Sequence, residues 1–155
     1  MPPLKGIDRG LNGQVLKALE ESGHGDQIVI VDPSYAIPEG ARVVDYQGDS
    51  SAQALKGILK LVPFEESKHI PEFDVLAMAP DPPANTCDAL NEFRKVAVEL
   101  GFDLDATPRL DKDAGELLPG FYTEANSPER STIFFRTRDI KAYACAMFIV
   151  GHSQE

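Results

Sequence analysis

Side chains that exchange protons near neutral pH are scarce in this sequence, because the 155-residue chain has only three histidines. One of them, His24, lies between glycines in the segment Gly23-His24-Gly25-Asp26, which joins a predicted helix to a predicted strand. Asp32 ends that strand, and ligands of open α/β sheets bind at the carboxyl ends of strands. An imidazole and a carboxylate near one sheet edge can transfer protons as an acid and a base. We therefore expect His24 and Asp32 to form a site at one edge of the sheet.

Both residues also have ordinary structural explanations. A Gly-His-Gly turn can expose an idle histidine, and an aspartate before a proline, as in Asp32-Pro33, starts a turn through its side chain. The other histidines are weaker candidates, since His69 lies in a predicted loop and His152 lies near the end of the sequence.

Other common chemistries have no signature in the sequence. There is no His-x-His, His-Glu-x-x-His or Cys-x-x-Cys spacing, so we expect no metal site. No phosphate-binding glycine loop and no Gly-x-Ser-x-Gly segment occurs. The two cysteines, Cys87 and Cys145, cannot form a disulfide framework, which favours a reducing cytoplasm.

Composition narrows the class of partner. The net charge of −10 argues against binding to the phosphate backbone of nucleic acids. The longest nearly apolar run, residues 142–150, is far shorter than the ~20 residues that span a bilayer. We expect a cytoplasmic protein with no nucleic-acid or membrane partner.

The elements that must position the candidate residues alternate between strand and helix. Asn12 is expected to cap the first helix, and Gly23 to end it in a left-handed conformation. The long segment 102–129 lacks periodicity and is predicted as a loop with a solvated acidic surface. This alternation predicts one α/β domain over residues 1–155, with three layers and a central mixed or parallel sheet flanked by helices. The predicted strands are 27–32, 41–46, 73–79, 133–135 and 143–150, and further helices are predicted at 51–61 and 86–100.

The sequence resembles the fucose mutarotase and ribose pyranase family, most specifically in the Gly-His-Gly-Asp block and the aspartate that follows the next strand. The resemblance runs from residue 4 to about residue 145, with gaps. The residues that carry it are Leu4-Lys5-Gly6-Ile7, Leu16-Lys17-Ala18-Leu19, Gly23-His24-Gly25-Asp26 with Asp32, and more weakly Ala54-Leu55-Lys56-Gly57-Ile58-Leu59, Val62-Pro63-Phe64, Val75-Leu76-Ala77-Met78 and Lys141-Ala142-Tyr143-Ala144.

The resemblance implies an isomerase that interconverts the anomers or ring forms of a free monosaccharide such as fucose or ribose, without a cofactor. It implies His24 as the catalytic acid and base, and Asp32 as a substrate-binding residue. It also implies homo-oligomers, often decamers, with sites near subunit contacts.

Two departures from the family pattern concern the substrate contacts. The family's substrate-binding Arg follows a Glu. Counting back from Lys141 without gaps places Thr132 at the position of that arginine. Allowing two inserted residues instead brings Glu129-Arg130 into register, and Arg130 is therefore taken as a substrate-binding residue. The family also continues through Thr-Gly-Glu to a Tyr/Phe-x-Asn motif and another strand, which we expect to be missing here.

The missing motif leaves two other functions open. The chain could be a non-catalytic member that binds a sugar or polyol and regulates or scaffolds another process. It could also be a structural subunit with a decayed site, which predicts no ligand at all.

Overall fold

A five-stranded mixed sheet forms the centre of the fold in the computed structural model, which describes residues 10–62, 76–78, 80, 87–100, 118–127 and 130–151. The strand order is β2-β4-β1-β5-β3. β4 runs parallel to both β1 and β2, whereas β5 runs antiparallel to β1 and β3. The elements are α1 (Gly13–Glu21), β1 (Gln27–Val31), β2 (Arg42–Asp45), α2 (Ser51–Leu59), β3 (Leu76–Ala77), α3 (Asp88–Glu99), α4 (Leu118–Ala125), β4 (Thr132–Arg136) and β5 (Ala146–Ile149).

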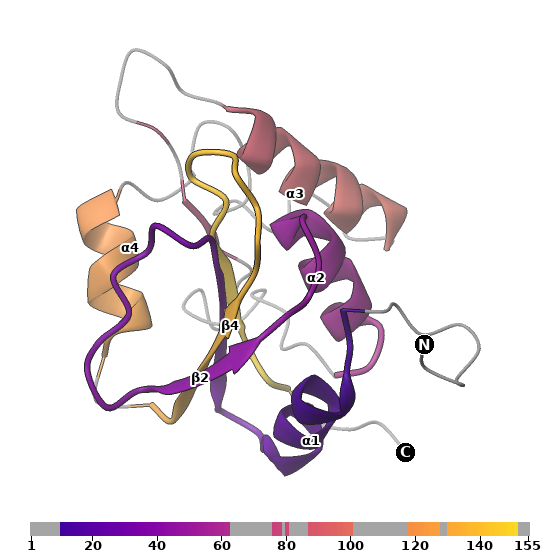
Figure 1. Cartoon of the computed structure of the whole chain (residues 1–155), viewed down its shortest axis with the longest axis vertical. Coiled ribbons are helices and arrows are strands. Elements are labelled where there is room, and N and C mark those ends of the chain that lie inside the picture. The colour runs from indigo at the N-terminus through magenta and orange to yellow at the C-terminus, as the bar shows by residue number, and fades with distance from the viewer. Residues whose placement is uncertain are drawn as a thin grey trace.

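Helices cover both faces of the sheet, so the predicted three-layer α/β fold with a mixed sheet is confirmed. Figure 1 shows α4 on one side of the strands and α2 and α3 on the other. Alternate residues of β1 divide between two cores, as the two-residue period of a strand requires. Ile28 and Ile30 join the core with α1, α2 and α3, whereas Val29 and Val31 join the core with α4.

The connection from α1 to β1 begins as the sequence predicts and ends differently. The side chain of Asn12 accepts a hydrogen bond from the backbone N–H of Val15 at 3.0 Å and so caps α1. The predicted left-handed Gly23 is wrong, because α1 ends on an extended Ser22 and the positive φ, +89°, falls on Gly25. Glycine adopts that conformation without a steric penalty.

The predicted loop over 102–129 is wrong for its last part, where α4 forms. Pro119 and Gly120 favour a loop in the sequence, but a proline is tolerated in the first turn of a helix, where its missing N–H costs nothing. Phe121 and Ala125, four residues apart, then bury one face of α4 against the sheet. Residues 101–117 lie outside the described part of the chain, as does most of the strand predicted at 73–79.

A buried polar network fixes the loop between β4 and β5. The carboxylate of Asp139, 2% exposed, accepts hydrogen bonds from the backbone N–H groups of Ser51 at 2.9 Å and Lys141 at 2.9 Å. Thr137 donates its backbone N–H to the carbonyl of Val31 at 2.9 Å, and its hydroxyl also donates to that carbonyl. The loop is therefore tied to both the start of α2 and the end of β1.

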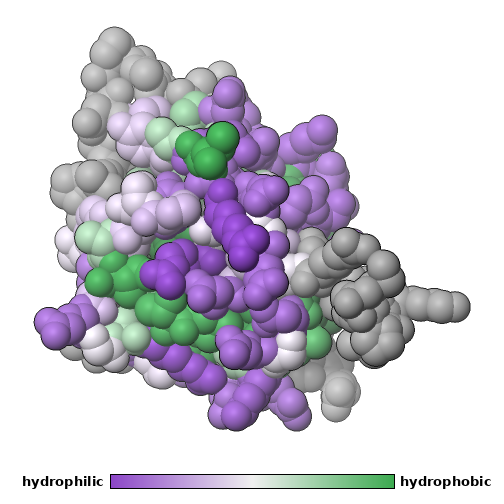
Figure 2. Space-filling model, viewed as in Figure 1, coloured by the Kyte–Doolittle hydropathy of each residue, from purple (hydrophilic) through white to green (hydrophobic). Residues whose placement is uncertain are grey.

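The surface is mainly hydrophilic on the side drawn in Figure 2, with apolar side chains gathered over β2 and the chain that leads into it. On β2, the side chain of Val43 is 37% exposed. Among the described residues, no helix combines the length and the hydrophobicity needed to cross a membrane.

Replacing Asp139 with alanine is expected to lower the free energy of unfolding by about 2–3 kcal/mol, because two backbone N–H groups lose a charged acceptor. Urea denaturation measures the change. The matched control is Asp49→Ala, which removes an exposed carboxylate and is expected to change stability by less than about 0.5 kcal/mol. Equal effects of the two substitutions would contradict a structural role for the network.

Candidate functional site

The two main candidate residues lie at opposite ends of β1. His24 precedes the strand and Asp32 follows it, and five residues at about 3.3 Å each place roughly 17 Å of strand between them. The expectation that an imidazole and a carboxylate meet at one sheet edge within a single copy is therefore wrong. A strand carries its flanking residues to opposite edges of the sheet, and the prediction overlooked this.

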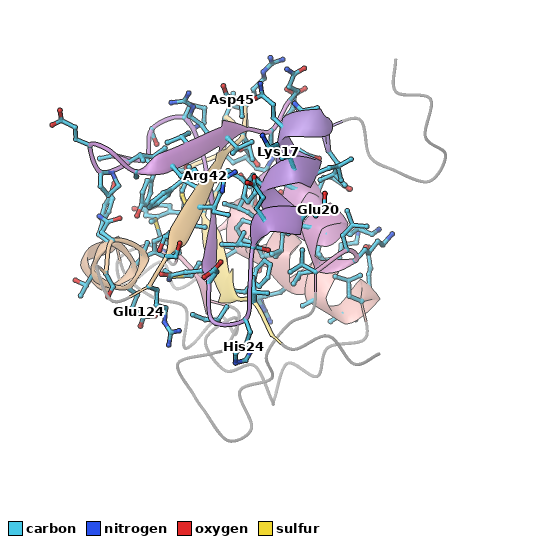
Figure 3. The ribbon with its side chains drawn as sticks, turned by 90° about the horizontal axis from the view of Figure 1, so that it is seen from below. Lys17, Glu20, His24, Arg42, Asp45 and Glu124 are labelled. Carbon is cyan, nitrogen blue, oxygen red and sulfur yellow. The ribbon has the colours of Figure 1, made fainter. Side chains whose placement is uncertain are left out.

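The turn that carries His24 is tightly held although the side chain is exposed. Gly25 donates its N–H to the carbonyl of Val150 at 2.9 Å, and Val150 donates its N–H back to the carbonyl of Asp26 at 2.9 Å. The side chain of Asp26 accepts from the N–H of Gly23 at 2.8 Å. Figure 3 shows the His24 side chain pointing outward from this connection between α1 and β1.

Arg130 lies at the same end of the sheet as His24. Its Nη1 donates to the carbonyl of Gly25 at 3.1 Å, and the residue is half-buried. The structure therefore brings His24 and Arg130 together at the amino end of β1 and separates both from Asp32.

Asp32 is buried, 4% exposed, at the carboxyl end of β1. Its Oδ1 accepts from the backbone N–H of Ser34 at 3.0 Å and from the Ser34 hydroxyl at 2.7 Å, so Asp32 does start a turn. Its Oδ2 accepts from the N–H of Ala144 at 3.2 Å. The Cys145 thiol also forms a hydrogen bond with the Asp32 side chain.

A cavity of about 290 Å³ opens beside Asp32. It lies at the edge where β1 and β4 end and β5 begins, which is the edge where α/β sheets commonly bind ligands. One carboxylate and one serine hydroxyl line the cavity together with aromatic and sulfur-containing side chains. The lining residues are Asp32, Ser34, Tyr35, Met78, Tyr122, Ala142, Tyr143 and Cys145.

A pair of tyrosines makes the aromatic wall. The rings of Tyr35 and Tyr122 stack with centroids 4.6 Å apart. The Tyr35 hydroxyl donates to the side chain of Asn126 at 3.2 Å, and the Tyr122 hydroxyl accepts from the N–H of Ala36 at 3.3 Å. These contacts fasten α4 to the turn that follows β1, so α4 forms one side of the cavity.

Two lining residues stay protonated at neutral pH. Burial, followed by the electrostatic effect of nearby Cys145, raises the pKa of Tyr35. Burial, followed by the negative charge of Asp32, raises the pKa of the Cys145 thiol. Neither side chain can therefore act as a base at neutral pH, and the cavity offers a carboxylate surrounded by neutral groups.

Several candidates from the sequence do not enter this cavity. His69 and His152 lie outside the described residues. Within the described part of the chain, no group of three or more histidine, cysteine, aspartate or glutamate residues could hold a metal ion. From the sequence, Tyr143 is recognised only within the segment Lys141-Ala142-Tyr143-Ala144, and not as a site residue, although it lines the cavity. Tyr143 was predicted as the first residue of a strand over 143–150, whereas β5 begins at Ala146 and Tyr143 has a left-handed backbone with φ 61°.

Comparison with known proteins places these features in a family. A sequence model of the RbsD / FucU transport protein family matches residues 5–152. The L-fucose mutarotase of Actinobacillus pleuropneumoniae serotype 5b is 35% identical over 112 residues, which cover 70% of this chain and 73% of that protein.

Solved structures share the fold over nearly the whole chain. The structure of the protein Atu2016 has a TM-score of 0.75 at 25% identity and covers 97% of this chain and 96% of its own. The fucose mutarotase of Streptococcus pneumoniae, solved with L-fucose, has a TM-score of 0.73 at 24% identity and covers 97% of this chain and 99% of its own.

Alkylation of the folded protein at pH 7.5 is expected to label Cys87 and to leave Cys145 unmodified. Cys87 is half-buried, whereas Cys145 is 1% exposed and its pKa is raised, so it forms little thiolate. Mass spectrometry after iodoacetamide treatment measures both sites, and treatment in urea provides the fully labelled control. Labelling of both cysteines at the same rate in the folded protein would contradict the closed wall beside Asp32.

Proposed function

Because this chain belongs to the RbsD / FucU transport protein family, we propose that it interconverts the anomers or ring forms of a free monosaccharide without a cofactor. The family predicted from the Gly-His-Gly-Asp segment is confirmed, since the relatives that match most of the chain are named L-fucose mutarotases. The observation that carries the proposal is the cavity beside Asp32, where a buried carboxylate and a serine hydroxyl line the wall together with aromatic side chains. L-Fucose is the first substrate to test.

The cavity has the chemistry to hold a sugar. Oδ2 of Asp32 accepts a hydrogen bond from one sugar hydroxyl, and the Ser34 hydroxyl lies on the same side of the cavity. The Tyr35 and Tyr122 rings give the apolar face of a sugar ring a flat surface. A few polar groups on a mainly apolar wall are typical of small-molecule sites.

The order of elements at the end of the chain supplies a counterpart for the family's last motif. No Tyr-x-Asn triplet occurs in the sequence. β4 is followed by Thr137-Arg138-Asp139, then by Tyr143-Ala144-Cys145, then by β5, and the family match extends through β5. This is the order in which the family places Thr-Gly-Glu, Tyr/Phe-x-Asn and a strand. We assign Tyr143 and Cys145 to the place of that motif, and both line the cavity.

In the proposed mechanism, the His24 of a second copy of the chain transfers the protons at the cavity. The imidazole removes the proton of the anomeric hydroxyl while the bond from the anomeric carbon to the ring oxygen breaks, and the imidazolium returns a proton to the ring oxygen. The open-chain sugar then rotates and closes by the reverse steps. Because β1 separates His24 from the cavity of its own copy, a homo-oligomer brings the His24 of one copy to the Asp32 of another. Arg130 enters the site together with His24.

A non-catalytic sugar- or polyol-binding function is the alternative. It is favoured by the cavity itself, because no imidazole lies among its described lining residues. This function predicts sugar binding without faster exchange of anomers.

Anomer exchange measured by NMR saturation transfer tests the proposed function directly. With L-fucose, D-ribose, D-galactose and D-glucose, the protein is expected to accelerate exchange of at least one sugar. The His24→Ala variant is expected to lose at least about 100-fold of that acceleration, because general acid–base catalysis contributes a factor of this order. Its fold should persist, since the side chain is exposed.

The matched control for that variant is Gln47→Ala, which truncates another exposed side chain and should keep full activity. Sugar binding without acceleration in the unaltered protein would favour the alternative function. Full activity in His24→Ala would exclude His24 as the proton-transfer group.

A further inference from the structure

We propose that β2 pairs with β2 of a second copy of the chain, antiparallel and around a two-fold axis at Val43. The two sheets then join into one, and each copy supplies the same surface to the contact. This inference does not rest on the proposed function, because no residue of β2 lines the cavity beside Asp32. It rests on the hydrogen bonding, the exposure and the charges along one edge of the sheet.

The bonds between β2 and β4 show which backbone groups of β2 face outward. In the described sheet β2 is an edge strand that pairs with β4, and Tyr46 donates its N–H to the carbonyl of Arg136 at 2.9 Å. Successive residues of a strand direct their backbone groups to alternate sides, so the even-numbered residues of β2 bond to β4. The N–H and C=O groups of Val43 and Asp45 therefore point outward. In agreement, the carbonyl of Asp45 accepts a long hydrogen bond, 3.5 Å, from Nδ2 of Asn12.

The outer side of β2 is open and partly apolar. Figure 1 shows the sheet from its edge, with β2 in front, and Figure 2 shows apolar side chains gathered there between hydrophilic ones. On β2 itself, the side chain of Val43 is 37% exposed. β2 has no proline, lysine or bulge, three features that commonly keep an edge strand from pairing with another chain. Its charged side chains already have partners, Arg42 with Glu21 and Asp45 with Arg136.

A two-fold axis at Val43 uses the outward groups of both strands. The two Val43 residues exchange N–H to C=O hydrogen bonds and bring their exposed side chains into contact. Two residues farther along, the N–H of Asp45 meets the carbonyl of Ala41 of the second copy. The other two groups at that position already have partners. The N–H of Ala41 donates to the carbonyl of Pro38 at 3.2 Å, and the carbonyl of Asp45 accepts from Asn12. An axis at Asp45 would instead place two like charges opposite each other, which is unfavourable.

The same axis places a turn of each copy over a depression of the other. Residues 38–41 form a turn before β2, and Glu39 in that turn is exposed. An open depression of about 550 Å³ lies at the other end of β2, between the strand and α1. Figure 3 shows Lys17 of α1 and Asp45 of β2 at this corner. The residues that line the depression are Asn12, Gly13, Gln14, Lys17, Asp45 and Gln47.

Charge complementarity favours a second copy as the partner. Because the paired strands are antiparallel, the turn of one copy meets the depression of the other, and the carboxylate of Glu39 comes toward the ammonium group of Lys17. The axis repeats this contact, so a pair of opposite charges flanks each end of the joined strands. Opposite charges placed in this way fix the register of a contact.

This contact is separate from the one that brings His24 to the Asp32 of another copy. β4 and β2 of both copies lie between the two β1 strands, so five strand spacings of about 4.8 Å keep them roughly 24 Å apart. An assembly therefore loses half of its mass, and none of its catalytic contacts, when pairing through β2 is broken.

Val43→Lys tests the pairing, because it places two like charges at the axis. The variant is expected to have half the assembly mass of the unaltered protein in sedimentation velocity at the same concentration. Hydrogen exchange at the amide of Asp45 is expected to become about tenfold faster, whereas exchange at the amide of Val44, which bonds to β4, changes by less than twofold. The matched control is Val98→Lys, which alters an exposed valine on α3 and should change neither measurement.

Charge reversal tests the register. Lys17→Glu and Glu39→Lys are each expected to weaken association about tenfold, because the axis repeats every unfavourable pair. The double variant reverses both charges and is expected to restore association. No recovery in the double variant would overturn the register at Val43.

A monomeric unaltered protein, or an unchanged assembly mass in Val43→Lys, would overturn the proposal. L-Fucose anomer exchange per copy is expected to stay within twofold in Val43→Lys, and its loss would overturn the separation of the two contacts. If the unaltered protein accelerates no sugar, the proposed function fails, and the masses and amide exchange rates still decide whether β2 pairs with β2.

Discussion

β1 is the constraint on which the site depends. All five of its residues are buried, and it pairs with β4 on one side and β5 on the other, as the central strand of the sheet. Such a strand cannot bend to bring its ends together. It therefore fixes His24 and Asp32 at opposite edges of each copy, and any chemistry that needs both residues needs two copies. The same rigidity gives each residue a defined position, His24 through the turn before the strand and Asp32 through the turn after it.

The carboxylate of Asp32, at the end of β1, holds the backbone around it and also lines the cavity. Asp32 accepts hydrogen bonds from the backbone of its own turn and from the N–H of Ala144, and these contacts fix the carboxylate in the wall of the cavity. The loop that supplies Ala144 and Tyr143 is held in turn by Asp139, whose carboxylate is almost fully buried. These hydrogen bonds preorganise the cavity. Preorganisation reduces the entropy cost of binding a ligand.

Local patterns in the sequence predicted much of the fold, and the assembly of the site depended on contacts that they do not contain. The β-branched run of β1 and the cap at Asn12 are local signals, and both were read correctly. Helix α4 was missed because Pro119 and Gly120 usually interrupt helices, and only packing against the sheet explains why one forms here. The cavity combines residues from four separate segments, near Asp32, at Met78, on α4 and after β4, so its lining could not be assembled from spacing alone.

The most direct measurement of the two-copy account mixes two inactive variants. His24→Ala and Asp32→Asn homo-oligomers each lack one half of every site, and subunit exchange between them creates some sites with both residues intact. The account predicts that a 1:1 mixture recovers about a quarter of the unaltered anomer-exchange activity, because each intact half is present at half of the contacts. Ala142→Trp, which blocks the cavity from an exposed position, serves as a second cavity variant if Asp32→Asn is unstable. No recovery in mixtures whose mixed composition is verified by native mass spectrometry would contradict a site shared between copies.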